Sequence, residues 1–234
     1  MKIKALTAIF ALLLLIVLAL SLFFCAQKKP EVAPVAEPLD LPTRYPPAQR
    51  IVAIGDLHGD LEATRTALRL AGAIDEDDLW AGGTTVLVQT GDQLDRGDDE
   101  FEILDLLDAL TTQAHANGGA VHVLNGNHEL MNVKQDLRYV TLGGFLDFLP
   151  TPVADPETVA PQVVVDAVHE RLKAVRPGRP FAMRLVNRNV ITVVGDTVFV
   201  HGGVLPHVVE YGIEHLNQES RAWIRRDRQY PPDI

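Results

Sequence analysis

The chain has 234 residues, of which 47% are hydrophobic, so it is long enough to fold as one domain around a sizeable core. Its formal net charge of -10 argues against nucleic acid as a partner, because binding to a phosphate backbone requires a basic surface. The single cysteine, Cys25, excludes an internal disulfide framework and a zinc site built from several cysteines.

Residues 1–26 have the pattern of an export signal, since two lysines precede a nearly uninterrupted apolar run. At roughly 20 residues, the run is also long enough to span a bilayer as an uncleaved anchor. Cys25 adds a third interpretation, because its position before a polar, proline-rich stretch resembles the lipidated cysteine of a bacterial lipoprotein. The alternative is that Cys25 is one more apolar residue of a spanning helix. We therefore expect an exported, membrane-tethered protein of the periplasm or cell envelope.

Residues 27–50 are rich in proline and predict a semi-rigid linker, which leaves residues 51–234 for one α/β domain. Four short apolar runs in this domain predict buried strands. They lie at 51–54, 86–88, 121–124 and 198–200. Helical patterns at 61–71 and around 103–110 separate the first three runs, and this alternation predicts a parallel α/β core.

The segment 133–195 is less regular, and we expect it to form an insertion that shapes the wall of a pocket. Its composition predicts a helix over 161–175 and a hairpin through 183–200 that turns near Asn187–Asn189. The residues from 207 to 226 also have a helical pattern.

Each predicted strand ends in a glycine-bearing turn with side chains that can bind metal. The turns read GDLHGD at 55–60, GDQLDRG at 91–97, GNHE at 126–129 and HGG at 201–203. Carboxyl ends of parallel strands share one edge of a sheet, so these turns should converge. Each polar residue alone has an ordinary structural explanation, such as a turn aspartate or a core histidine. Four such turns at four strand ends instead indicate a site for two ions of Mn, Fe or Zn.

In this order, the four motifs resemble those of the calcineurin-like metallophosphoesterases, and the DRG and NHE details are similar to the phosphoprotein-phosphatase branch. The flanking DRGDDE at 95–100, NHELMN at 127–132 and Arg138-Tyr139 are similar to the Shewanella-like bacterial protein phosphatases. The resemblance covers roughly residues 51–223. It implies an α/β metallophosphoesterase sandwich with the metal-site loops at the carboxyl ends of its strands.

The resemblance also implies a set of metal ligands. By this correspondence Asp56 and His58 bind the first ion, Asp92 bridges both ions, and Asn127 and His201 bind the second. A carboxylate can bridge two cations, and an amide oxygen can bind one without adding charge.

Three further residues match positions of the family that take part in proton transfer or phosphate binding. His128 corresponds to the general acid, a role that suits imidazole because it titrates near neutral pH. Asp95 corresponds to the carboxylate that orients this histidine, and Arg96 to an arginine that binds the substrate phosphate in a fork. Glu129 is expected to support the site through hydrogen bonds.

The implied reaction is hydrolysis of phosphomonoesters by a hydroxide bound between the two metals. Phosphoserine or phosphothreonine on protein is the first expectation for the substrate, with phosphotyrosine and small phosphoesters left open. The alternatives are a phosphodiesterase, a dinucleotide-polyphosphate hydrolase, or a non-catalytic phosphate-binding domain that lacks the second metal.

One departure from the family lies near the end of the sequence. The family pattern requires a further histidine for the second metal, on a later strand and turn. Nothing after Val200 has the pattern of a strand. We therefore expect the domain to be truncated at its C-terminus, with an incomplete second metal site.

Overall fold

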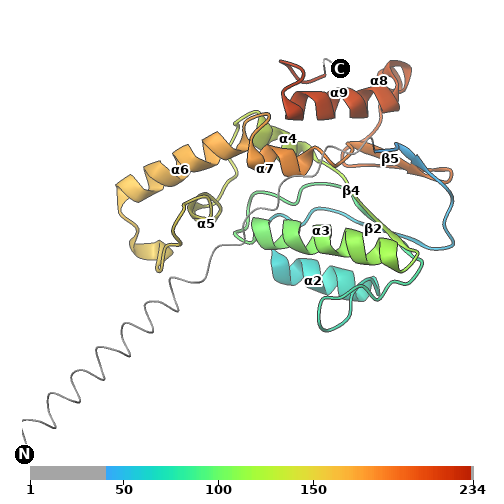
Figure 1. Cartoon of the computed structure of the whole chain (residues 1–234), viewed down its shortest axis with the longest axis horizontal. Helices are drawn as coiled ribbons and strands as arrows, with labels where there is room; N and C mark the ends of the chain where they lie inside the picture. The colour runs from blue at the N-terminus through green and yellow to red at the C-terminus, as the bar shows by residue number, and fades with distance from the viewer. Residues whose placement is uncertain (1–40, 233–234) are drawn as a thin grey trace, which may run out of the picture. The chain divides into compact units, whose positions relative to one another are not determined.

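The computed structural model describes residues 41–232 of the chain (Figure 1). The predicted signal or anchor segment with Cys25, and most of the predicted linker, lie outside the described residues. Within the described part, no helix is both long enough and apolar enough to cross a membrane.

Three parallel strands form the sheet that carries most of the predicted motifs. They are β2 (Ile51–Ile54), β3 (Val86–Gln89) and β4 (Ala120–Val123), in the spatial order β2-β3-β4. The helices α2 (Leu61–Leu70) and α3 (Glu100–Ala116) connect them. The three predicted strands and both helices between them are thus confirmed.

A second sheet has the order β1-β5-β6, and it contains the fourth predicted strand. β5 (Ile191–Val194) pairs antiparallel with β6 (Thr197–Val200). We had expected β6 to lie in the parallel sheet with the other three strands, and this expectation is wrong. The predicted turn near Asn187–Asn189 is also wrong. The hairpin turns at Gly195-Asp196, where the positive φ of Gly195 (62°) suits a two-residue turn.

The edge strand β1 (Arg44–Tyr45) lies within the segment predicted as linker and pairs parallel with β5. The backbone N–H groups of Val193 and Gly195 donate to the carbonyl oxygens of Thr43 and Tyr45. Proline-rich sequence favours extended backbone, and an edge strand tolerates the missing N–H groups of flanking prolines. The same composition that predicts a linker is therefore compatible with this short strand.

The insertion between β4 and β5 is helical. It contains α4 (Asn127–Val133), α5 (Leu142–Leu146), the 3-10 turn η1 (Pro156–Thr158), α6 (Pro161–Val175) and α7 (Pro180–Leu185). The α6 helix has the bounds that the sequence predicts, and a proline opens it, as is common at a first helical position. The helix α7 occupies residues that we had assigned to the first arm of the hairpin.

The helical pattern predicted over 207–226 is confirmed, although it is divided in two. α8 (Pro206–Tyr211) and α9 (Ile213–Arg225) meet at Gly212, whose φ of 98° interrupts the helix. Within residues 41–232 no strand follows β6. Trp223 and Ile224 of α9 are buried against side chains of α4 and α7.

The two faces of the parallel sheet are covered by different layers. Leu87 on β3 packs with Leu68 of α2 and Leu110 of α3, whereas its neighbour Val88 packs with Val194 of the second sheet. In Figure 1, α2 and α3 accordingly lie on one side of β2 and β4, and β5 and α9 lie on the other. Because both faces are apolar and covered, the edge where the strands end is where polar loops can gather.

Candidate metal centre

The loops that follow β2 and β3 are joined directly by hydrogen bonds. Ile54 of β2 is in register with Gln89 of β3, so the two strands end level. The backbone N–H groups of Leu57 and His58 then donate to the carbonyl oxygen of Asp92, at 2.8 and 3.0 Å. The predicted convergence of motifs from separate strand ends is confirmed at this point.

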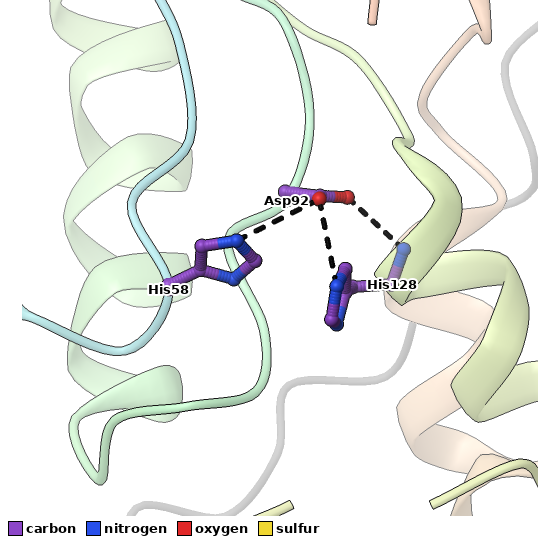
Figure 2. A group of neighbouring side chains, drawn as sticks. All are labelled: His58, Asp92 and His128. Atoms are coloured by element: carbon purple, nitrogen blue, oxygen red, sulfur yellow. Dashed lines mark hydrogen bonds and ion pairs between the residues drawn. The ribbon is translucent and has the colours of Figure 1, made fainter. Parts of the chain in front are cut away.

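One candidate metal cluster consists of His58, Asp92 and His128 (Figure 2). His58 Nε2 lies 3.7 Å from Asp92 Oδ2, and His128 Nε2 lies 3.8 Å from the same oxygen. The other carboxylate oxygen of Asp92 accepts a hydrogen bond of 3.0 Å from the backbone N–H of His128. Loops from β2 and β3 and the start of α4 thus supply one side chain each.

A second cluster consists of Asp56, Asp92 and His201. His201 Nε2 lies 3.2 Å from Asp92 Oδ2, while His201 Nδ1 lies 3.8 Å from Asp56 Oδ1. Asp56 also approaches His58, whose Nε2 is 3.6 Å away. Asp92 belongs to both clusters, which is the arrangement that a bridging carboxylate requires. His201 joins the site although β6 lies in the other sheet.

Two buried nitrogens in these clusters indicate that the residues fit cations. His58 Nδ1 lies 2.9 Å from the carbonyl oxygen of Leu94, so it carries the proton and Nε2 presents a lone pair. Neither His58 Nε2 nor His201 Nδ1 has a hydrogen-bond partner in the described part of the chain. Buried polar atoms without partners are uncommon, and a divalent ion between them and the carboxylates would satisfy both. Oxygen and nitrogen donors together suit Mn, Fe or Zn.

Asn127, the predicted amide ligand, is the first residue of α4 and directly precedes His128. Its side chain is exposed, and its amide nitrogen lies 3.7 Å from the sulfur of Met131. The structure therefore places Asn127 beside His128 at the start of α4, and its role as a ligand stays a prediction.

A buried pair of side chains lies beside the clusters. His128 Nδ1 is 2.6 Å from Asp95 Oδ2, and both residues are at most 2% exposed. The exposed Arg96 lies on the other side of the ring, with one guanidinium nitrogen 3.4 Å from His128 Nε2. The carboxylate fixes the orientation of the imidazole, so that Nε2 faces both Arg96 and Asp92.

Glu129 supports the site through its hydrogen bonds, as expected. Its buried carboxylate accepts from the backbone N–H groups of Asp92, Gln93, Leu94 and Gly126. Burial raises the pKa of Glu129, and the N–H donors of Asp92 and Gly126 act in the opposite direction. This one side chain ties the loop after β3 to the start of α4.

Sequence reasoning missed the supporting role of Glu100, Asn132 and Arg171, although the first two lie in the quoted segments 95–100 and 127–132. All three side chains are buried, and they surround Asp95. A signal for Arg171 was present in the sequence. It lies four residues from both Ala167 and Val175 in the predicted helix, so it interrupts an apolar stripe with a charge.

The fold and the site together define a class of protein. A parallel sheet gathers two carboxylate–histidine clusters around a shared aspartate, beside an oriented histidine and an exposed arginine. Such an arrangement is typical of two-metal sites that act on phosphoesters.

Comparison with known proteins agrees with this class. Residues 49–221 match the family described as calcineurin-like phosphoesterase, and the chain belongs to this family. It is 42% identical over 210 residues to Shewanella-like protein phosphatase 2 of Arabidopsis thaliana, in a match that covers 79% of this chain and 54% of that protein. Shewanella-like protein phosphatase 1 of Plasmodium berghei is 29% identical, over 76% of this chain and 45% of the relative.

A solved structure shows the same relationship. The cold-active protein-tyrosine phosphatase of a psychrophilic Shewanella species superposes with a TM-score of 0.64 at 28% sequence identity. The match covers 79% of this chain and 51% of that one. The chain thus spans about half the length of the curated relatives it matches.

Proposed function

We propose that this chain hydrolyses phosphomonoesters, with phosphoserine or phosphothreonine on protein as its first substrate class. The observation that carries the proposal is the oriented His128, whose Nδ1 is held by Asp95 at 2.6 Å while Nε2 faces the shared Asp92. A proton donor next to a two-metal cluster is what the departure of an alkoxide from phosphorus requires. The relatives named as protein phosphatases support phosphorylated protein as the substrate.

In this proposal the five predicted ligands hold two divalent ions of Mn, Fe or Zn. They are Asp56, His58, Asp92, Asn127 and His201. When bound, such ions act as Lewis acids toward the phosphate and lower the pKa of water.

Two other residues act on the substrate. Arg96 binds the phosphate oxygens with its guanidinium fork, which is exposed and therefore accessible. His128 gives a proton from Nε2 to the leaving oxygen, because its Nδ1 is engaged by Asp95.

The first test separates the proton donor from the metal ligands. His128→Asn should lower the turnover of an aryl phosphate by about a hundredfold or more while the metal content stays unchanged. Asp92→Asn should lower the content of both metals, because a neutral amide replaces the carboxylate that the two clusters share. If His128→Asn itself loses metal, His128 is a ligand together with His58 and Asp92, and the assignment as general acid is wrong.

Phosphotyrosine is a second candidate substrate, and one observation favours it. The Tyr139 ring is 44% exposed, its centroid lies 5.1 Å from that of His128, and the Arg96 guanidinium carbon lies 5.7 Å from its centre. It would offer an aromatic surface to an aryl phosphate.

Assays with matched phosphoserine, phosphothreonine and phosphotyrosine peptides, each with Mn, Fe or Zn added, would rank the substrates. Turnover of a phosphodiester or a dinucleotide polyphosphate, without turnover of any phosphopeptide, would contradict the proposal. Binding of phosphate without turnover of any ester would indicate a non-catalytic domain.

A further inference from the structure

A fully buried arginine in the helical insertion has no role in the chemistry described so far. Arg171 of α6 has an exposed fraction of 0%, as do Ala167 and Val175, which lie one helical step before and after it. Arginine is almost never fully buried unless its charge is paired. Its Nη1 donates to the carbonyl oxygen of Gly144 at 2.8 Å, and its Nη2 lies 3.6 Å from Asp95 Oδ1. Its other polar partners also lead to Asp95.

The first set of contacts leads to the backbone of Asp95. Arg171 Nη1 donates to Glu100 Oε2 at 2.6 Å, and Nη2 donates to Glu100 Oε1 at 3.0 Å. Glu100 Oε1 in turn accepts the backbone N–H of Asp95, at 2.6 Å. The guanidinium thus fixes the carboxylate that fixes the main chain at Asp95.

The second set of contacts leads to the side chain of the same aspartate. Arg171 donates to Asn132 Oδ1 from Nη2 at 2.7 Å and from Nε at 3.1 Å. This orients the amide of Asn132, whose Nδ2 donates to Asp95 Oδ1 and to the carbonyl oxygen of His128, both at 3.0 Å. Asp95 Oδ1 is therefore engaged, and Oδ2 is left for His128 Nδ1.

Stability alone is a poor explanation for this network. A buried ion pair is often no more stabilising than apolar side chains of the same volume. Moreover, Asp95 has a φ of 67°, a left-handed conformation that a residue other than glycine adopts only when its surroundings hold it there. All the contacts of Glu100 and Asn132 named above converge on this aspartate or on His128.

We propose that Arg171 is a positioning residue, which acts through Glu100 and Asn132 to hold Asp95, and hence His128, in the orientation for proton donation. This inference rests on the proposed function, because it takes His128 as the proton donor. In this arrangement α6, a helix of the insertion, contributes to the proton-transfer step.

The test uses two esters that differ in their need for a proton. Arg171→Lys keeps the positive charge but cannot bind both partners in a fork. We expect its kcat to fall by about tenfold or more for phenyl phosphate, whose leaving group needs a proton. For p-nitrophenyl phosphate the fold-loss in kcat should be at least about three times smaller. KM should change little. The control is Arg184→Lys on α7, whose ion pairs go to Asp105 and Asp108, and it should leave both rates unchanged.

A second measurement does not depend on activity. At one fixed pH, a long-range proton–nitrogen NMR spectrum should give a His128 Nδ1 signal typical of a protonated nitrogen that donates to Asp95, in the parent and in Arg184→Lys. In Arg171→Lys this signal should be shifted or absent. Should the lysine variant fail to fold, Glu100→Leu combined with Arg171→Leu removes both charges together and should give the same two effects.

Three outcomes would overturn the inference, namely equal losses with both esters, unchanged rates with both, or an unchanged His128 signal. A parent protein that hydrolyses neither ester would contradict the proposed function instead, and the NMR comparison would still decide whether Arg171 positions His128.

Discussion

Glu129 offers a direct test of how the loop after β3 and the start of α4 are held together. Its Oε2 accepts the N–H groups of Asp92 and Gly126 at 2.8 and 2.6 Å. Its Oε1 accepts those of Gln93 and Leu94 at 2.9 and 3.2 Å. The substitution Glu129→Gln keeps the shape of this side chain but replaces one acceptor oxygen by an NH₂ group that faces two N–H donors.

The size of the effect follows from these contacts. Two of the four hydrogen bonds to a charged acceptor are lost, at about 1.5–3 kcal/mol each. Burial raises the pKa of Glu129, which shows that the charge itself is costly inside the protein, and glutamine removes that cost. We therefore expect a net loss of about 2–4 kcal/mol in the free energy of unfolding.

Urea denaturation without added metal measures this loss, and Glu102→Gln is the matched control. Glu102 is exposed in the first turn of α3, so its substitution should change the free energy of unfolding by no more than about 0.5 kcal/mol. Metal affinity should fall by about 10–100-fold in Glu129→Gln, because the backbone of Asp92 is no longer held. A Glu129→Gln protein with the midpoint and slope of the parent would refute this account of the loops.

Burial lowers the pKa of His122 to about 4, so the unfolded chain binds a proton first as pH falls, and the free energy of unfolding should drop by about 3 kcal/mol from pH 7 to pH 4. His122→Phe should remove most of this slope in denaturant titrations. A β-carbon at Gly126 would collide with the Asp92 carboxylate, so Gly126→Ala should lose metal, whereas Gly55→Ala, with nothing within 4 Å, should retain it. If Cys25 is lipidated, Cys25→Ala should abolish incorporation of labelled palmitate, whereas membrane association without label in the parent would favour a spanning anchor.

The strands of the parallel sheet could be predicted because each is a short apolar run followed by a glycine turn. The same reasoning found the strand at 198–200 but did not assign it to a separate sheet. β6 pairs only with β5, the strand directly before it, and the contact that is remote in sequence is the pairing of β5 with β1. The turn of its hairpin was predictable in principle. Gly195-Asp196 is a two-residue turn signal between two apolar runs, and it is a stronger signal than Asn187–Asn189.

The site was predictable to the extent that its residues follow strand ends in recognisable motifs. The network behind Asp95 was not, because Arg171 and Glu100 are 71 residues apart and meet only when α6 packs near α3. The helical spacing of apolar residues in α6 indicates that a charge interrupts its apolar stripe. It does not indicate which buried group that charge pairs with. Supporting residues are therefore harder to find from sequence than the side chains they support.

The backbone of the site shows why the motif alone is not sufficient. Among the described residues, seven other than glycine have a positive φ, and four of them lie in the site loops: His58, Asp92, Asp95 and Arg96. Each such conformation costs about 1 kcal/mol or more, and glycine would avoid the cost but would remove the side chain that the chemistry needs. The strain is offset by partners outside the four metal-site turns, since the Asp95 N–H donates to Glu100 and the Arg96 N–H donates to the carbonyl oxygen of Tyr139. The motifs supply the reactive groups, and the helix and loop residues around them hold those groups in a backbone conformation that they would not adopt alone.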